Sequence, residues 1–170
     1  MSPLDYKKSQ KAYYAPKADP EIITIPPMQF LMIDGKRYPG EDNADYKAAI
    51  EVLYAVSYKL KFLLKDQPPA GYTDYVVPPL EGLWWMEGEW IQENKDAWQW
   101  TMMIRQPEFI SENHVKDACS VVRKKKGLST AGIRLESYAE GLCVQMMHHG
   151  PYSTEAPNIA RMHAYAQDQG

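Results

Sequence analysis

The residues best suited to chemistry in this 170-residue chain are five tryptophans gathered within seventeen positions. They fall on two successive expected β-strands and the loop between them, and one carboxylate, that of Glu81, lies three residues before the first. Indole rings offer broad apolar surfaces that attract cations, and one nearby charge can orient a ligand. We therefore expect a pocket for a flat, apolar molecule that can also be cationic. The alternative is a tryptophan-rich core, in which each indole N–H needs a hydrogen-bond partner. The five residues are Trp84, Trp85, Trp90, Trp98 and Trp100.

Alternation along the strands decides which of these side chains can share a surface. Trp84 and Trp85 are expected to point to opposite faces, so at least one can line a cleft. Glu81 should share a face with Leu83 and Trp85, where its carboxylate could balance a ligand cation or act as a general base. A solvated strand glutamate is the alternative. On the second strand, one face is predicted to carry Trp98, Trp100, Met102 and Ile104, and the other Gln99, Thr101 and Met103.

Two tyrosines and a methionine complete the candidate ligand-binding residues. Tyr138, at the end of a strand, and Tyr152, in a Gly-Pro-Tyr turn, could each polarise a ligand carbonyl, although surface tyrosines at turns are common. Met147 and its neighbouring methionines fit a core, and their adaptability also suits a pocket for varied ligands.

No metal, cofactor or nucleophile signature accompanies these residues. His148 and His149 are adjacent on an expected strand and so point in opposite directions, which prevents both from binding one metal ion. Neither a nucleophile elbow nor a glycine-rich phosphate loop occurs, and we expect no cofactor. Cys119 and Cys143 lack a metal-binding pattern and fit reduced thiols in a cytoplasmic protein.

Composition excludes several classes of partner. The net charge of −3 gives no long-range attraction to nucleic acid, and the basic run at 123–126 fits the end of a helix. No stretch approaches the roughly 18 apolar residues needed to span a membrane. The N-terminal residues have no apolar segment of the kind found in signal peptides.

The pattern of the chain predicts an α+β fold with an antiparallel sheet and helices packed on it. Residues 1–19 form an arm or a short helix, and a strand at 21–33 is interrupted by Pro26-Pro27 and ended by Asp34-Gly35. Ser111 should cap a helix that Gly127 ends, and Ser153 should cap the last helix. The further elements are a helix at 45–65, strands at 75–85 and 98–104, a helix at 111–126, a strand pair at 133–137 and 142–149, and a helix at 154–169.

Two parts of the chain have a similar sequence pattern, which we call the internal repeat. FLMIDG followed by DYKAAIEVLY resembles VQMMHHG followed by APNIARMHAY, which suggests a duplicated strand–helix–strand–strand module. We expect a first module at 20–106, a connecting helix at 107–130 and a second module at 131–170 that lacks its last two strands. Either the sequence is truncated there, or another element or subunit covers the open sheet edge.

The chain resembles the stand-alone branch of the GyrI-like (gyrase-inhibitor-like) small-molecule-binding family. The resemblance rests on FLMIDG, YVVPPLEGLWW, WQWTMMIRQPEFI, RLESYAEG and LCVQMMHHGPY. It implies two pseudo-symmetric modules with a ligand cleft between them, lined by aromatic side chains and an acidic residue. It places a further pocket glutamate in a strand beyond the last helix expected here. No DNA-binding helix-turn-helix accompanies the domain.

The resemblance implies two activities. Some members are effector-binding domains for bulky, often cationic, aromatic compounds, and others hydrolyse cyclopropane-bearing DNA-alkylating toxins. Our leading hypothesis is a single domain that senses or sequesters such xenobiotics. The alternatives are a toxin hydrolase, with Glu81 and Tyr138 as catalytic candidates, and a protein-interaction module that forms a homodimer through the open sheet edge.

Overall fold

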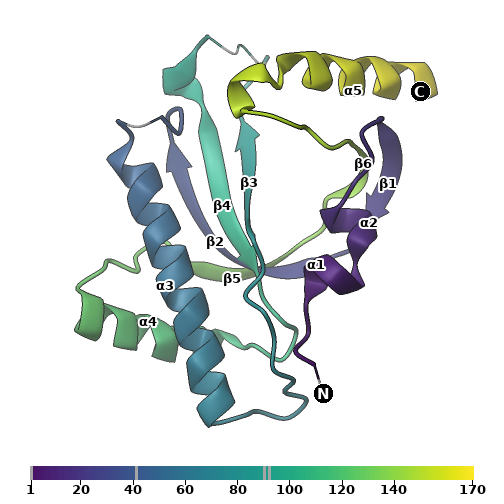
Figure 1. Cartoon of the computed structure of the whole chain (residues 1–170). Coiled ribbons are helices and arrows are strands. Elements are labelled where there is room, and N and C mark those ends of the chain that lie inside the picture. Colours follow the sequence, from purple (N-terminus) through teal and green to yellow (C-terminus); the bar gives the residue numbers. More distant parts are fainter. Residues whose placement is uncertain (1, 41, 90, 92) are drawn as a thin grey trace. The chain divides into compact units, whose positions relative to one another are not determined.

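The computed structural model describes residues 2–40, 42–89, 91 and 93–170, and its fold is α+β. The chain divides into two compact units (Figure 1). Unit 1 contains the N-terminal residues up to Leu4 together with Met28–Ser137, and unit 2 contains Asp5–Pro27 and Tyr138–Gly170. The modules predicted at 20–106, 107–130 and 131–170 stay a prediction.

Unit 1 contains a four-stranded sheet in the order β3-β4-β2-β5. Strand β4 pairs in antiparallel fashion with β2 on one side and with β3 on the other. Strand β3 forms the edge of the sheet, and β5 ends where unit 1 gives way to unit 2. The strands span Met28–Lys36 (β2), Leu80–Trp85 (β3), Gln99–Arg105 (β4) and Arg134–Tyr138 (β5).

Two helices build the core of unit 1 on one face of this sheet. Helix α3, Ala44–Asp66, packs against β2 and β4 and contacts helix α4, Glu112–Lys126 (Figure 1). The core joins buried apolar residues from both helices and from strands β2 and β4, and partly buried Leu80 of β3 and Leu135 of β5 pack against it. Burial of this surface is the main stabilising term for such a unit. Its fully buried members include Leu31, Leu53, Val56, Leu60 and Ile104.

The helix ends follow from local chemistry. The Asn43 side chain accepts a hydrogen bond from the backbone amide of Tyr46 at the start of α3. Ser111 and His114 form a reciprocal capping box at the start of α4, and Gly127 ends this helix with a positive φ of 65°. The helix predicted at 111–126, with its cap and its terminal glycine, is confirmed within one residue.

Unit 2 contains a two-stranded antiparallel sheet and three helices, two of them a single turn long. Strand β1, Glu21–Ile25, pairs with β6, Gly141–Gln145, so that Ile23 lies opposite Cys143. Helix α5, Ala156–Gln169, contacts β6 but buries none of its own residues. The short elements are α1, Tyr6–Ser9, α2, Lys11–Tyr14, and the 3-10 turn η2, Tyr152–Thr154.

In two places, strands that are consecutive in the sequence belong to different sheets, which corrects the pairing predicted from the sequence. The predicted strand pair at 133–137 and 142–149 is wrong, because β5 joins the sheet of unit 1 whereas β6 pairs with β1. Likewise Pro26-Pro27 separates β1 from β2, which belong to different sheets. Proline cannot donate a ladder hydrogen bond, so the paired proline ends one strand before the next begins.

Three local predictions are also corrected. Asp34-Gly35 does not end a strand, since β2 continues to Lys36. The strand predicted at 75–85 begins only at Leu80, and Tyr75 instead forms an isolated bridge with Leu4. The last helix begins at Ala156 without a side-chain cap, so Ser153 does not cap it. Among the described residues, we find no helix long and apolar enough to cross a membrane.

Candidate ligand-binding site

The sheet of unit 1 separates the tryptophans instead of gathering them. Trp84 lies opposite Trp100 in the β3–β4 register, whereas Trp85 lies opposite Gln99. Directly opposite residues share a face, and successive residues alternate between faces. Trp84 and Trp100 therefore belong to the face that carries α3, and Trp85 belongs to the other. Trp90 lies outside the described residues.

Trp100 is part of the core. Its side chain is 1% exposed, and its ring meets Tyr46 of α3 edge-to-face at 5.3 Å between centroids. Its indole N–H donates to the backbone oxygen of Arg37 at 3.0 Å. The partner that a buried indole requires is thus supplied by the backbone. The predicted contact between Trp100 and a ligand stays a prediction. The contacts that Trp100 makes in this structure are those of a core residue.

Glycines make room for the indoles on the face that carries α3. A Cβ atom at Gly35 would lie 2.0 Å from Cζ2 of Trp100. A Cβ atom at Gly82 would lie 2.4 Å from Cη2 of Trp84, so the Trp84 ring crosses its own strand above Gly82. Trp84 remains 43% exposed. Gly35 therefore serves close packing and not the turn expected from the sequence.

Trp98 belongs to the connection before β4. It is 9% exposed and meets Tyr38 edge-to-face, with the ring centroids 5.0 Å apart. The ammonium of Lys95 lies 4.4 Å from the centroid of the Tyr38 ring, an arrangement typical of a cation–π contact. These contacts join the end of β2 to the segment that contains the 3-10 turn η1, Lys95–Ala97. The predicted ligand contact of Trp98 stays untested.

The opposite face of the sheet, which we call the distal face, carries the remaining candidates from β3. Glu81 lies opposite Met103 and Leu83 opposite Thr101, so both share a face with Trp85. The predicted grouping of Glu81, Leu83 and Trp85 is confirmed by this register. Along a strand, a residue rises about 3.3 Å, which places the Cα atoms of Glu81 and Trp85 about 13 Å apart. A carboxylate and an indole that is 39% exposed thus flank Leu83.

Next to these residues the distal face carries a hydrogen-bonded polar group from β2, β4 and β5. Buried Thr101 donates its hydroxyl to Asp34 Oδ1 at 2.6 Å. Arg134 binds both carboxylate oxygens of Asp34, at 2.9 and 3.1 Å, and donates through Nε to Glu136 at 2.6 Å. Partial burial opposes the charge of Arg134, but its bonds to Glu136 and Asp34 outweigh it and raise the pKa of the guanidinium. Arg134 thereby fixes two carboxylates in place.

The sequence-based reasoning missed this polar group. In the sequence, Asp34 comes after a hydrophobic run and before a glycine, a pattern typical of a turn, and Arg134 is 100 residues further along the chain. Alternation along each strand could have predicted which side chains of that strand share a face with Asp34 or with Thr101. Their pairing needed the β2–β4 register, which the sequence does not reveal.

Tyr138 and Glu140 lie at the connection from β5 to β6. Burial, then the charges of Glu140 and Cys143, raise the pKa of the Tyr138 phenol. Partial desolvation also raises the pKa of the Glu140 carboxyl, although residue 140 as a whole is exposed to solvent. A carboxyl with a raised pKa is a common general acid or base, and the sequence-based reasoning did not select Glu140.

The other two candidates lie in unit 2. Met147 is half-buried, and its backbone amide donates to the backbone oxygen of Lys17 at 2.7 Å. Tyr152 lies in η2 with 85% of its surface exposed. Their predicted ligand contacts stay predictions. No cluster of three or more histidine, cysteine or carboxylate side chains suited to a metal ion occurs within the described residues.

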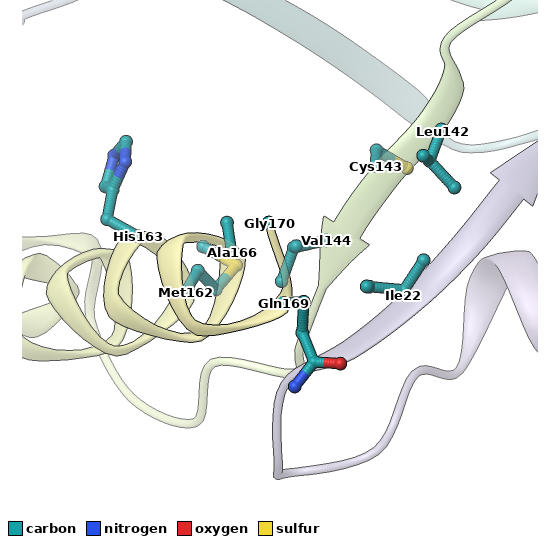
Figure 2. Close-up of a pocket in the computed structure, with 9 residues that line it drawn as sticks. All are labelled: Ile22, Leu142, Cys143, Val144, Met162, His163, Ala166, Gln169 and Gly170. Carbon is teal, nitrogen blue, oxygen red and sulfur yellow. The ribbon is translucent and has the colours of Figure 1, made fainter.

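A separate apolar pocket of about 490 Å³ lies within unit 2, between α5 and the β1–β6 sheet (Figure 2). Ile22, Leu142 and Val144 line it from the strands, and Met162 and Ala166 line it from the helix. Cys143, His163, Gln169 and Gly170 complete the lining. None of the predicted site residues borders this pocket.

The α+β domain described above is similar to proteins of known structure. The model of the GyrI-like small molecule binding domain matches residues 18–170. Three crystal structures of Listeria innocua proteins are similar over nearly all of this chain. An uncharacterized conserved protein is 45% identical with a TM-score of 0.89, covering 98% of this chain and 82% of its own. A hydrolase is 43% identical with a TM-score of 0.87, covering 99% and 82%, and another structure described as a hydrolase is 44% identical with a TM-score of 0.86, covering 98% and 85%.

The chain therefore belongs to the GyrI-like small-molecule-binding domain family, as the resemblance of its motifs indicated. No functionally curated protein matches it.

Proposed function

We propose that this protein binds bulky, flat aromatic compounds, including cations, on the distal face of the unit 1 sheet. Trp85 would stack on the aromatic ring of the ligand, and Glu81 would balance a positive charge. The observation that carries the proposal is the β3–β4 register, which puts both side chains on one face on either side of Leu83. Membership of a small-molecule-binding family supports it.

The proposal narrows the tryptophan-lined cleft expected from the sequence. Trp98 and Trp100 are buried against Tyr38 and Tyr46, so we assign them to the scaffold. The biological role that fits such binding is sensing or sequestration of xenobiotics in the cytoplasm. The two cysteines, one in each unit and both free, support that compartment.

Adjacent tryptophans with nearly equal exposure provide a matched test. The protein is titrated with the planar cation ethidium, and binding is followed by dye fluorescence. Trp85→Ala should weaken binding about 5- to 30-fold, because an aromatic or cation–π contact contributes about 1–2 kcal/mol. Trp84→Ala, on the face that carries α3, should retain wild-type affinity. Equal losses in both variants, or no binding at high micromolar dye, would contradict the proposal.

A hydrolase is the second candidate, because two similar structures at 43% and 44% identity are described as hydrolases. The substrate class implied by the family resemblance is a toxin with a cyclopropane activated by a conjugated carbonyl. Water would add to a ring carbon as a ring C–C bond breaks, and the bonding electrons would pass to the carbonyl. Glu81 is the candidate base that takes the water proton and then gives it to the ring-opened product.

Product analysis tests this activity. A cyclopropane-bearing alkylating toxin is incubated with the protein, and the ring-opened water adduct is quantified by mass spectrometry against buffer alone. The hydrolase proposal predicts an adduct that is formed faster than in buffer and is reduced in Glu81→Gln. Recovery of unchanged toxin at the buffer rate would contradict it while leaving the binding proposal intact.

A further inference from the structure

The outer face of helix α3 carries three aromatic side chains, Tyr54, Tyr58 and Phe62, which we call the aromatic row. Consecutive members are four residues apart, a spacing that puts them on one side of a helix. The rings of Tyr54 and Tyr58 stack with their centroids 6.5 Å apart. Tyr58 is 48% exposed and Phe62 is 58% exposed. Neighbouring apolar side chains exposed together in this way are typical of an interaction surface.

The aromatic row takes no part in the packing of α3 on its own unit. The helix packs against α4, β2 and β4, all of which belong to unit 1. The residues that it buries there include Val52, Val56 and Leu60, on the side of the helix opposite Tyr58. A strand that joins a sheet does so at an edge, so added strands would leave the outer face of α3 exposed.

Charged residues extend the aromatic row at both ends. Glu51 lies seven residues before Tyr58 and Lys65 lies seven residues after it, and both are exposed. Residues seven apart lie within about 20° of one line along a helix, so both share the outer face with the aromatic row. The order along this face is an acid, three aromatic residues and a base. Reversed, the pattern is its own complement, because acid then faces base and aromatic faces aromatic.

We propose that the outer face of α3 is a homodimer interface, on which α3 of a second copy of this chain packs antiparallel. With the two-fold axis through Tyr58, Tyr54 faces Phe62 of the partner subunit. Glu51 then faces Lys65 of the partner subunit, and each of these pairs occurs twice, as a two-fold interface requires.

Two features of helix packing and of Lys65 make this arrangement feasible. A shallow crossing of about 20°, common between packed helices, keeps positions seven residues from the centre within reach of long side chains. The Lys65 ammonium lies 3.6 Å from the Asp74 carboxylate, and its side chain is 60% exposed. Lys65 can therefore bind a second carboxylate from the partner subunit.

Light scattering during size-exclusion chromatography tests the dimer. We expect twice the chain mass of 19.5 kDa for the wild-type protein. Tyr58→Lys should give a monomer, because it brings two like charges together at the axis. Lysine favours helix, so circular dichroism should show an unchanged fold. Tyr152→Lys, the same change at an 85% exposed position of unit 2, should leave the mass unchanged. A monomeric wild-type chain, or a dimer that survives Tyr58→Lys, overturns the proposal.

Charge reversal tests the antiparallel register. Glu51→Lys and Lys65→Glu each replace two exposed ion pairs with like charges, so each should weaken the dimer about 3- to 30-fold in sedimentation equilibrium. The double variant restores both pairs and should return to within about threefold of the wild-type dissociation constant. Additive losses in the double variant would overturn the register, because in parallel helices each residue faces its own copy and reversal restores nothing.

Discussion

Trp84 and Trp100 are direct cross-strand partners on the face of the sheet that carries α3. The next residue, Trp85, points to the distal face, where Glu81 also lies. A cluster of indoles in the sequence thus serves two purposes. Trp100 and Trp98 pack into the scaffold, and Trp85 is the indole that we propose contacts a ligand.

The Trp100 ring packs closely over Gly35 of β2, so a methyl group added at residue 35 should destabilise the fold. Gly35→Ala should lower the free energy of unfolding by about 1–3 kcal/mol, because its Cβ would overlap the Trp100 ring. Urea denaturation followed by circular dichroism measures the change. Gly40→Ala is the control, since its Cβ would lie 3.2 Å from the Tyr38 ring, which can shift slightly. Similar stability for both variants would show that the ring over Gly35 moves freely.

The polar group on the distal face should contribute to stability through Thr101. Thr101→Val removes a buried hydroxyl that donates to the Asp34 carboxylate, and we expect a loss of about 1–2 kcal/mol in urea denaturation. Thr24→Val, at an exposed position of β1, removes a hydroxyl without a comparable effect. If Thr101→Val were neutral, Arg134 alone would suffice to hold Asp34.

Asp74 should make stability fall in acid. Burial tends to raise the pKa of its carboxyl, but Lys61, Lys65 and the backbone amide of Tyr75 outweigh burial and lower it below the usual 3.8. An acid with a lowered folded pKa stabilises the fold above its unfolded pKa, and this stability is lost as pH falls through the folded pKa. Asp74→Asn should therefore flatten the loss of stability below about pH 5. A slope identical to wild type would contradict this assignment.

Glu140 should have the opposite effect. Because partial burial raises the pKa of its carboxyl above the usual 4.5, the carboxylate form disfavours the folded state at neutral pH. Glu140→Gln should raise the urea midpoint at pH 7, and the difference should shrink as pH falls below the usual 4.5, where the carboxyl becomes protonated in the folded and the unfolded state. A destabilising effect at pH 7 would indicate that the Glu140 carboxylate makes a favourable contact instead.

The charge of Glu81 should discriminate between ligands. Glu81→Gln should weaken binding of a planar cation but leave binding of a neutral planar compound of similar size unchanged, because only the cation gains from the carboxylate. Calorimetric titration with ethidium and with a neutral aromatic of matched area measures both affinities. An equal loss for the two compounds would mean that Glu81 acts through packing and not through charge.

Local signals in the sequence predicted the helices well, and long-range pairing accounts for most of the errors. Ser111 and Gly127 lie at helix ends, where nearby backbone groups determine their role. Only two residues separate β5 from β6, which resembles a hairpin, yet each strand pairs with a segment more than 90 residues away. Such pairing depends on tertiary packing that no local pattern records.

The candidate site was predicted in part. Alternation placed Glu81, Leu83 and Trp85 on one face correctly, because strand periodicity is a local property. It could not separate Trp98 and Trp100 as core residues, since their burial depends on Tyr38 and Tyr46 from other elements. The contact between Arg134 and Asp34 was not predicted for the same reason, because it joins residues 100 positions apart.

A crystal structure of the ethidium complex tests the central claim most directly. We expect the planar ring system to contact the Trp85 indole on the distal face, with its positive charge directed toward Glu81. Density for the dye in the pocket between α5 and β6, or stacked on Trp84 beside α3, would contradict that assignment.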